Sequence, residues 1–151
     1  MKAVIVIPAR LASTRLPEKL LQEVGGKTIL QHTYECARQA KKASRVIIAA
    51  DDERLLAAAR AFGAEAVMTD SGHQSGTERA AEAARGLGAD IIVNVQGDEP
   101  EIDPQTIDRL IAAQTAFSPF ASTLVCPFPE DARLDDPARV KAVLGRRLSG
   151  Q

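Results

Sequence analysis

The alternation of apolar strands with helices along the chain constrains the fold more than any other feature. Residues 3–7 form an unbroken run of Ala, Val and Ile, which is typical of a strand covered on both faces. Similar patterns predict strands at residues 3–7, 45–50, 66–68, 90–95 and 121–126, and helices at residues 29–40, 52–62, 76–87 and from 103 onward. This order predicts an α/β fold with a parallel sheet and helices on both faces.

Capping and turn residues mark the ends of the predicted helices. Asp51 or Asp52 is expected to cap the second helix, and Gly63 is expected to end it. Asp103 is followed by Pro104, which combines a capping residue with proline at the first helical position. That pair predicts where the fourth helix begins.

Composition narrows the class of protein. The 151 residues are 45% hydrophobic and 26% charged, which fits one globular domain with its own core. A net charge of −1 gives no overall attraction to nucleic acid or anionic membranes, and 3% aromatic residues disfavour base stacking. No apolar run is long enough for a membrane span or a signal peptide. We therefore expect a cytoplasmic domain in which Cys36 and Cys126 are reduced core thiols.

The segment after the first strand concentrates cations. It contains three basic side chains and two hydroxyls: Arg10, Ser13, Thr14, Arg15 and Lys19. Arginine offers a planar fork of donors and lysine a mobile point charge, and both suit phosphate oxygens. The segment lacks the glycines of a Walker loop and of a GxGxxG turn. Its charge alone leaves two interpretations open, a phosphate-binding loop and a solvated surface loop.

A second polar segment, residues 69–79, precedes an alanine-rich helix. Ser75 with Glu78 nearby is typical of an ordinary helix cap. His73 is more simply a partly exposed, hydrogen-bonding side chain than a catalytic base or a metal ligand. His32 lies within a helical pattern and is expected to be structural.

A third polar segment, residues 94–101, follows the fourth strand directly. Asp98, which comes after Gly97, is suited to hold Mg²⁺ beside a phosphate, although Gly-Asp is also common in plain turns. All three segments are expected beyond the carboxyl ends of parallel strands, where ligands bind in such sheets. Together they favour a metal–nucleotide site, with cations on the phosphates and the acid on the metal.

The same segments resemble the motifs of one known family. The matching residues are 7–10, 13–17 and 19 (Ile-Pro-Ala-Arg, Ser-Thr-Arg-Leu-Pro and Lys), 73–79 (His-Gln-Ser-Gly-Thr-Glu-Arg) and 94–100 (Asn-Val-Gln-Gly-Asp-Glu-Pro). In this order they closely resemble the 3-deoxy-manno-octulosonate (KDO) cytidylyltransferases, or CMP-KDO synthetases, over about residues 1–144. The acylneuraminate cytidylyltransferases share the style of the first motif and do not normally carry the other two in this form.

The resemblance implies a Rossmann-like nucleotidyltransferase fold and a reaction without a covalent enzyme intermediate. The anomeric hydroxyl of KDO would attack the α-phosphate of CTP with Mg²⁺ as cofactor, giving CMP-KDO and pyrophosphate for lipopolysaccharide biosynthesis. It implies that Arg10, Lys19 and Asp98 are the catalytic residues, and that Asp98 is the metal ligand. The implied CTP-binding residues are Pro8, Ala9, Arg10, Ser13, Arg15, Lys19, Ser75 and Gly76, and Gln96 would face the sugar.

Length is the main departure from the family pattern. Family members continue beyond residues 140–144 with a segment rich in aromatic residues, Arg and Pro, whereas this chain ends in Gly-Arg-Arg-Leu-Ser-Gly-Gln. The resemblance assigns most sugar contacts, a second metal-binding Asp and the interface of the expected homodimer to that further part. We therefore expect a nucleotide-binding domain at 1–126, a connection and incomplete acceptor part at 127–151, and impaired turnover. The chain is expected to be a truncated or frame-shifted gene product, or a partial sequence.

Two alternatives stay open at this point. The first is a non-catalytic CTP-binding fragment or an unstable remnant, and the second is a fragment of an acylneuraminate cytidylyltransferase. In the preferred interpretation CTP and KDO are the substrates, and neither nucleic acid nor a membrane is a partner.

Overall fold

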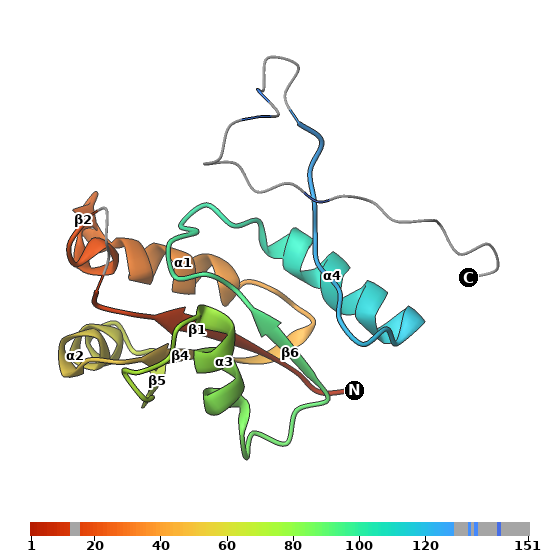
Figure 1. The fold of residues 1–151 in the computed structure, drawn as a ribbon, viewed down its shortest axis with the longest axis horizontal. Coiled ribbons are helices and arrows are strands. Elements are labelled where there is room, and N and C mark those ends of the chain that lie inside the picture. Colours follow the sequence, from red (N-terminus) through yellow and green to blue (C-terminus); the bar gives the residue numbers. More distant parts are fainter. Residues whose placement is uncertain (13–15, 129–132, 134, 136–141, 143–151) are drawn as a thin grey trace.

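The predicted parallel sheet is confirmed. The structure is a computed structural model that describes residues 1–12, 16–128, 133, 135 and 142. The sheet consists of β1 (Ala3–Ala9), β4 (Ala43–Ala50), β5 (Glu65–Met68) and β6 (Ile91–Asn94). The strands are parallel and lie in the order β5-β4-β1-β6 (Figure 1).

The strand order places β1 at a reversal of the chain path. From β1 the chain moves outward to β4 and β5, and it then crosses back to add β6 on the other side of β1. In the register, Ile5 of β1 lies between Val46 of β4 and Val93 of β6. Open parallel sheets bind ligands beyond the carboxyl ends of the strands at such a reversal. The fold therefore directs attention to the ends of β1 and β6.

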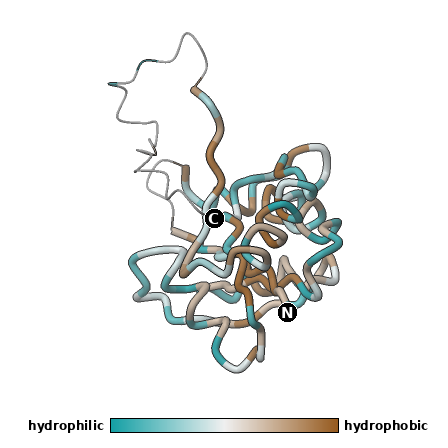
Figure 2. Tube along the Cα trace, turned by 90° about the vertical axis from the view of Figure 1, so that its right-hand side faces the viewer, coloured by the Kyte–Doolittle hydropathy of each residue, from teal (hydrophilic) through white to brown (hydrophobic). Residues whose placement is uncertain are grey.

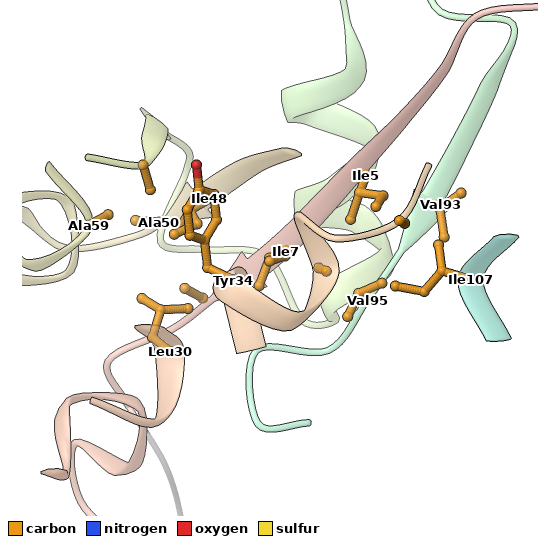
Figure 3. Close-up of a cluster of buried hydrophobic side chains, with 14 of the residues drawn as sticks. Ile5, Ile7, Leu30, Tyr34, Ile48, Ala50, Ala59, Val93, Val95 and Ile107 are labelled. Atoms are coloured by element: carbon orange, nitrogen blue, oxygen red, sulfur yellow. The ribbon is translucent and has the colours of Figure 1, made fainter. Parts of the chain in front are cut away.

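Alternate residues of β1 face two separate hydrophobic cores, which explains why the whole strand is apolar. Ile5 and Ile7 pack under α1 (Ile29–Ala37), α2 (Glu53–Ala61) and α4 (Pro104–Phe117), as Figure 3 shows for part of this cluster. Val4 and Val6 face the opposite side, where α3 (Gly76–Ala84) contributes Ala80 and Ala83. Figure 1 shows α1 and α4 on one side of the strands and α3 on the other, and Figure 2 shows the hydrophobic stretches running through the interior.

The helices begin at side-chain caps. Asp52, Ser75 and Asp103 each accept a hydrogen bond from a backbone N–H in the first turn, and Pro104 is the first residue of α4. The capping predictions are thus confirmed, with Asp52 rather than Asp51 as the cap of α2. In the described part of the chain no helix is long and apolar enough to cross a membrane.

The polar loop predicted after β1 contains more structure than its sequence indicates. It includes a 3-10 helix, η1 (Lys19–Leu21), and a small hairpin formed by β2 (Glu23–Val24) and β3 (Lys27–Thr28). Gly25 and Gly26 form its turn with φ of 61° and 78°, a conformation that glycine adopts without steric cost. Strands of two residues are too short to show a period.

The strand predicted at 121–126 is wrong. Residues 121–128 form no strand, and Phe120, Leu124 and Val125 are exposed. The segment has β-forming residues, but a strand also needs a hydrogen-bonding neighbour, and no described residues pair with it. Cys126 is consequently exposed and Cys36 only partly buried, so the expectation of two core thiols is also wrong.

Candidate nucleotide site

The carboxyl ends of β1 and β6 bring most of the predicted site residues together. Arg10 follows β1, Lys19 begins η1, and Asp98 lies in the turn after β6. These side chains line a cavity of about 160 Å³ together with neighbours from the same segments: Pro8, Ala12, Leu20, Gln96 and Gly97. Ser13 and Arg15 lie outside the described residues.

A second cavity adjoins the first. Its volume is about 150 Å³, and it shares Pro8, Arg10 and Gln96 with its neighbour. Its remaining lining comes from the start of α3 and the segment before it: His73, Gln74, Ser75, Gly76 and Arg79. Two adjoining compartments with Arg10 between them suit a ligand with two chemically different ends.

Lys19 and Asp98 form an ion pair across the first cavity. The Lys19 Nζ atom donates to Asp98 Oδ2 at 2.7 Å, and the two side chains are 38% and 45% exposed. The hydrogen bond from Lys19 lowers the pKa of Asp98 below its usual range. A half-exposed pair of this kind contributes little to stability, which leaves both groups free to exchange partners for a ligand.

Gly97 allows the turn after β6 to lie against β1. A Cβ at this position would be 3.0 Å from the backbone oxygen of Pro8 and 3.2 Å from Leu20 Cδ1. Helix α1 fixes the same turn from the other side, because the buried Thr33 hydroxyl donates to the Gly97 oxygen at 2.9 Å and Cys36 Sγ donates to the Pro100 oxygen at 3.3 Å. The backbone that carries Asp98 is therefore held from two directions.

Gly76 brings the start of α3 close to the ends of β1 and β6. A Cβ there would lie 3.1 Å from Pro8 Cγ and 3.1 Å from Gln96 Oε1. Ser75 Oγ accepts from the Glu78 N–H at 3.2 Å, so that the helix-cap interpretation of this segment is confirmed. Gln96 itself is exposed, and its Nε2 donates to Asn94 Oδ1 at 3.1 Å.

Ala9 is buried, and each of the two histidines hydrogen-bonds a protein group. Ala9 is fully buried in the core under α1 and is not among the residues that line the two cavities. His73 Nε2 hydrogen-bonds Glu82, whose pKa is lowered first by the Asp70 N–H and then by His73. His32 Nε2 hydrogen-bonds the Val24 oxygen and ties α1 to the hairpin. These hydrogen bonds agree with the expectation from the sequence, and a structural role for both histidines stays a prediction, since His73 also lines the second cavity.

The donor set at Asp98 fits a metal only in part. No cluster of three or more His, Cys, Asp or Glu side chains exists within the described residues. Magnesium often uses one or two carboxylates and takes its other oxygens from phosphates and water. A single ionised carboxylate beside two cations suits that mode of binding and does not suit a metal cage made of protein side chains.

The sequence did not predict one ion pair near the carboxyl ends of the strands, Asp51 with Arg79. Asp51 is only a candidate cap in the sequence, yet its carboxylate pairs with the buried guanidinium of Arg79. A signal was present, because Arg79 is four residues before Ala83 on the stripe of α3 that faces the sheet.

A parallel sheet with cavities at the chain reversal defines the Rossmann-like α/β class of folds. Comparison of this chain with known proteins identifies one family within that class. The sequence model described as "Cytidylyltransferase" matches residues 4–148. The chain belongs to this cytidylyltransferase family, which is a family of CTP-dependent nucleotidyltransferases. The resemblance inferred from the three motifs is therefore confirmed.

Relatives and solved structures agree with this assignment. The chain is 51% identical over 148 residues to the 3-deoxy-manno-octulosonate cytidylyltransferase of Rhodopirellula baltica, covering 96% of this chain and 59% of that protein. It is 45% identical, with a TM-score of 0.76, to CMP:2-keto-3-deoxy-manno-octonic acid synthetase complexed with CTP, covering 78% and 49% of the two chains. A cytidylyltransferase from Leptospira borgpetersenii is 29% identical, with a TM-score of 0.67 and coverage of 78% and 50%. The chain thus spans about 60% of the length of such curated relatives.

Proposed function

We propose that this chain carries the CTP-binding part of an enzyme that transfers a cytidylyl group to KDO. The observation that carries the proposal is the Lys19–Asp98 pair beside Arg10, in the crevice between β1 and β6. The solved synthetase with 45% identity and bound CTP supports the nucleotide, and the names of the curated relatives support KDO as the acceptor. The products would be CMP-KDO and pyrophosphate.

In this proposal the two cavities bind different ends of CTP. Arg10 and Lys19 hold the triphosphate in the first cavity. Ser13 and Arg15 are also proposed to bind CTP. Pro8, Ser75 and Gly76 border cytosine in the second cavity, and the buried Ala9 supports Pro8 from the next position of β1. Gln96, which lines both cavities, faces the sugar acid. Nucleotidyl transfer needs little beyond alignment of the attacking hydroxyl and stabilisation of phosphate charge, which fixed cations supply.

A divalent metal, proposed as Mg²⁺, would be held by Asp98 and by oxygens of the nucleotide. An aspartate is ionised at neutral pH, and an ionised carboxylate binds a cation without first losing a proton, which supports this role. When bound, the metal neutralises phosphate charge. In this proposal the Lys19–Asp98 ion pair separates when the nucleotide binds, so that Lys19 can turn to the triphosphate.

The proposed division of the chain follows from these roles. Residues 1–126 form the nucleotide-binding part, and residues 127–151 begin the acceptor and dimerisation part of the longer relatives. Within 127–151 the structure describes only residues 127, 128, 133, 135 and 142, so this division stays a prediction, as does the homodimer.

A thermal-shift titration with CTP and Mg²⁺ tests the nucleotide half of the proposal. At a CTP concentration of 100 times Kd, binding stabilises the folded state by about 2.7 kcal/mol, which raises Tm by about 5–10 °C for a chain of this size. Asp98→Asn should reduce the shift strongly. Asp90→Asn is the matched control, because Asp90 lies at the opposite end of β6, where it accepts from the Lys2 N–H. An unshifted Tm with every nucleotide contradicts the proposal and favours a remnant.

Pyrophosphate release tests the acceptor half. A version of the protein with the full length of its relatives should release pyrophosphate from CTP when KDO is added, and not when N-acetylneuraminate is added. Release with N-acetylneuraminate alone would transfer the assignment to the acylneuraminate enzymes. Absence of release with both acceptors would refute the proposed reaction.

A further inference from the structure

One buried charged group near the proposed site has no part in the roles assigned so far. Arg79 of α3 is almost completely buried, and its guanidinium faces the carboxylate of Asp51, with Nη2 to Oδ2 at 3.1 Å. The two side chains are only 3% and 11% exposed. Burying two charges is costly even when they pair, and apolar side chains of similar size often stabilise a fold equally well. The pair therefore calls for an explanation other than stability.

The guanidinium connects the ends of two strands to α3. Its Nη1 donates to Thr69 Oγ1 at 2.6 Å and to the Asp70 oxygen at 3.1 Å, just after β5. Thr69 Oγ1 in turn donates at 2.9 Å to the oxygen of Ala50, the last residue of β4. Because both Nη atoms are directed to protein acceptors, Arg79 is bound to its own fold although it lines the second cavity.

The second oxygen of Asp51 extends this network to the first loop. Asp51 Oδ1 accepts from the backbone N–H of Leu11 at 2.9 Å. Leu11 directly follows Arg10, which lines both cavities. One carboxylate thus joins the segment that carries Arg10 to the guanidinium that holds the start of α3.

We propose that the Asp51–Arg79 pair is a positioning unit that fixes the backbone beside Arg10, so that Arg10 faces both cavities. The inference rests on the proposed function, in which Arg10 holds the triphosphate of CTP. Arg79 lines the second cavity, and Asp51 lines a further cavity of about 590 Å³ beside Arg10. Their charged atoms are directed to each other and to protein partners, so in this account both residues act through the Leu11 amide. A fixed backbone on one side of Arg10 reduces the conformational freedom that is lost when the nucleotide binds.

A double-mutant cycle on the CTP dissociation constant tests this coupling. The four proteins are the unchanged chain, Asp51→Asn, Arg10→Ala and the double variant, titrated with CTP and Mg²⁺ by calorimetry. The amide introduced by Asp51→Asn has a single acceptor oxygen, and the charged Arg79 guanidinium binds it more strongly than the Leu11 N–H does. The Leu11 contact is then lost, so we expect Kd to rise about tenfold, which corresponds to about 1.4 kcal/mol. In the Arg10→Ala background the same change should alter Kd less than about twofold, because there is no cation left to position.

Two further arms separate positioning from a general loss of structure. Asp108→Asn is the matched control, since Asp108 also accepts one hydrogen bond on each carboxylate oxygen. Its two donors are the backbone N–H groups of Lys41 and Lys42, which precede β4 at the opposite end of the strands. It should leave the Kd for CTP unchanged. If Asp51→Asn is too unstable to titrate, Arg79→Lys takes its place. This variant keeps the positive charge and should show the same rise in the Kd for CTP.

Hydrogen exchange of the Leu11 amide reads the positioning directly and needs no nucleotide. Exchange should accelerate in Asp51→Asn and stay unchanged in Asp108→Asn. Unaltered Leu11 protection in Asp51→Asn, or an equal loss of CTP affinity with and without Arg10, would overturn the inference. If the unchanged chain binds no CTP while Leu11 protection still responds, the proposed function fails and the positioning of the backbone stands.

Discussion

Replacing Gly97 by alanine is the sharpest steric perturbation of the candidate site. The new Cβ would lie 3.0 Å from the Pro8 oxygen and 3.2 Å from Leu20 Cδ1. Ordinary contacts of a Cβ begin near 3.4 Å, so the gap must open by several tenths of an ångström. Gly97 is not among the glycines with positive φ, which means that the cost is steric and not a matter of backbone conformation.

The neighbouring backbone determines which part moves. Pro8 belongs to β1, which pairs with β4 through residues on both sides of it, so its oxygen is held firmly. The Leu20 side chain can yield, but the turn that carries Asp98 must also move away from β1 and strain the hydrogen bond from Thr33 to the Gly97 oxygen. Insertion of a methyl group into a packed position costs about 1–3 kcal/mol. For a chain of this length, that cost lowers Tm by about 2–12 °C.

Urea unfolding followed by circular dichroism measures this free energy. Gly76→Ala is the matched control. Its Cβ also meets atoms at 3.1 Å, but one of them is the flexible end of Gln96, and alanine improves the propensity of α3. We expect Gly97→Ala to lose at least about 1 kcal/mol more than Gly76→Ala. Equal midpoints for the two variants would refute the reasoning that the Pro8 backbone makes residue 97 intolerant of a side chain.

Three further predictions test the packing and charge around the site. Lys19→Ala should raise the pKa of Asp98 toward its usual range in an NMR titration. Because the folded-state pKa is lowered, the stability from this pair is present above the ordinary pKa of Asp98 and is lost as the pH falls through the folded value; an unchanged pKa would contradict the pairing. Thr33→Val should cost about 1–2 kcal/mol in urea unfolding by leaving the Gly97 oxygen without its donor, and no cost would mean that this bond is dispensable. Leu30→Ala should cost about 2–5 kcal/mol because Leu30 lies on the inward face of α1 and is fully buried, and a loss below about 1 kcal/mol would contradict its place in the core.

Much of the fold is predictable because burial on both faces leaves a strong pattern. Residues 3–7 are apolar throughout, since alternate side chains enter two cores. The caps Asp52, Ser75 and Asp103 are local signals that act within one helical turn, so they are readable without knowledge of the tertiary structure.

Features that depend on distant partners are the ones that sequence reasoning missed. Residues 121–126 have strand-forming side chains, but no described neighbour completes a ladder with them. The Asp51–Arg79 pair joins residues 28 positions apart. The groups that accept from Arg79 lie just after β4 and just after β5. Charge alone does not distinguish such a buried network from solvated side chains. The spacing of Arg79 and Ala83 indicates that Arg79 faces the sheet, but only the packing of α3 identifies Asp51 as its partner.

The central claim is that CTP and a divalent metal bind in the crevice between β1 and β6. Manganese carried by CTP broadens the NMR signals of nearby amides, so a titration of the isotope-labelled chain with Mn²⁺ and CTP locates the metal directly. We predict that the amides of Arg10, Gly97 and Asp98 broaden first, and that the broadening is lost in Asp98→Asn. Broadening centred on the opposite end of the strands, near Lys41 and Asp90, or no broadening that depends on CTP, would contradict the account.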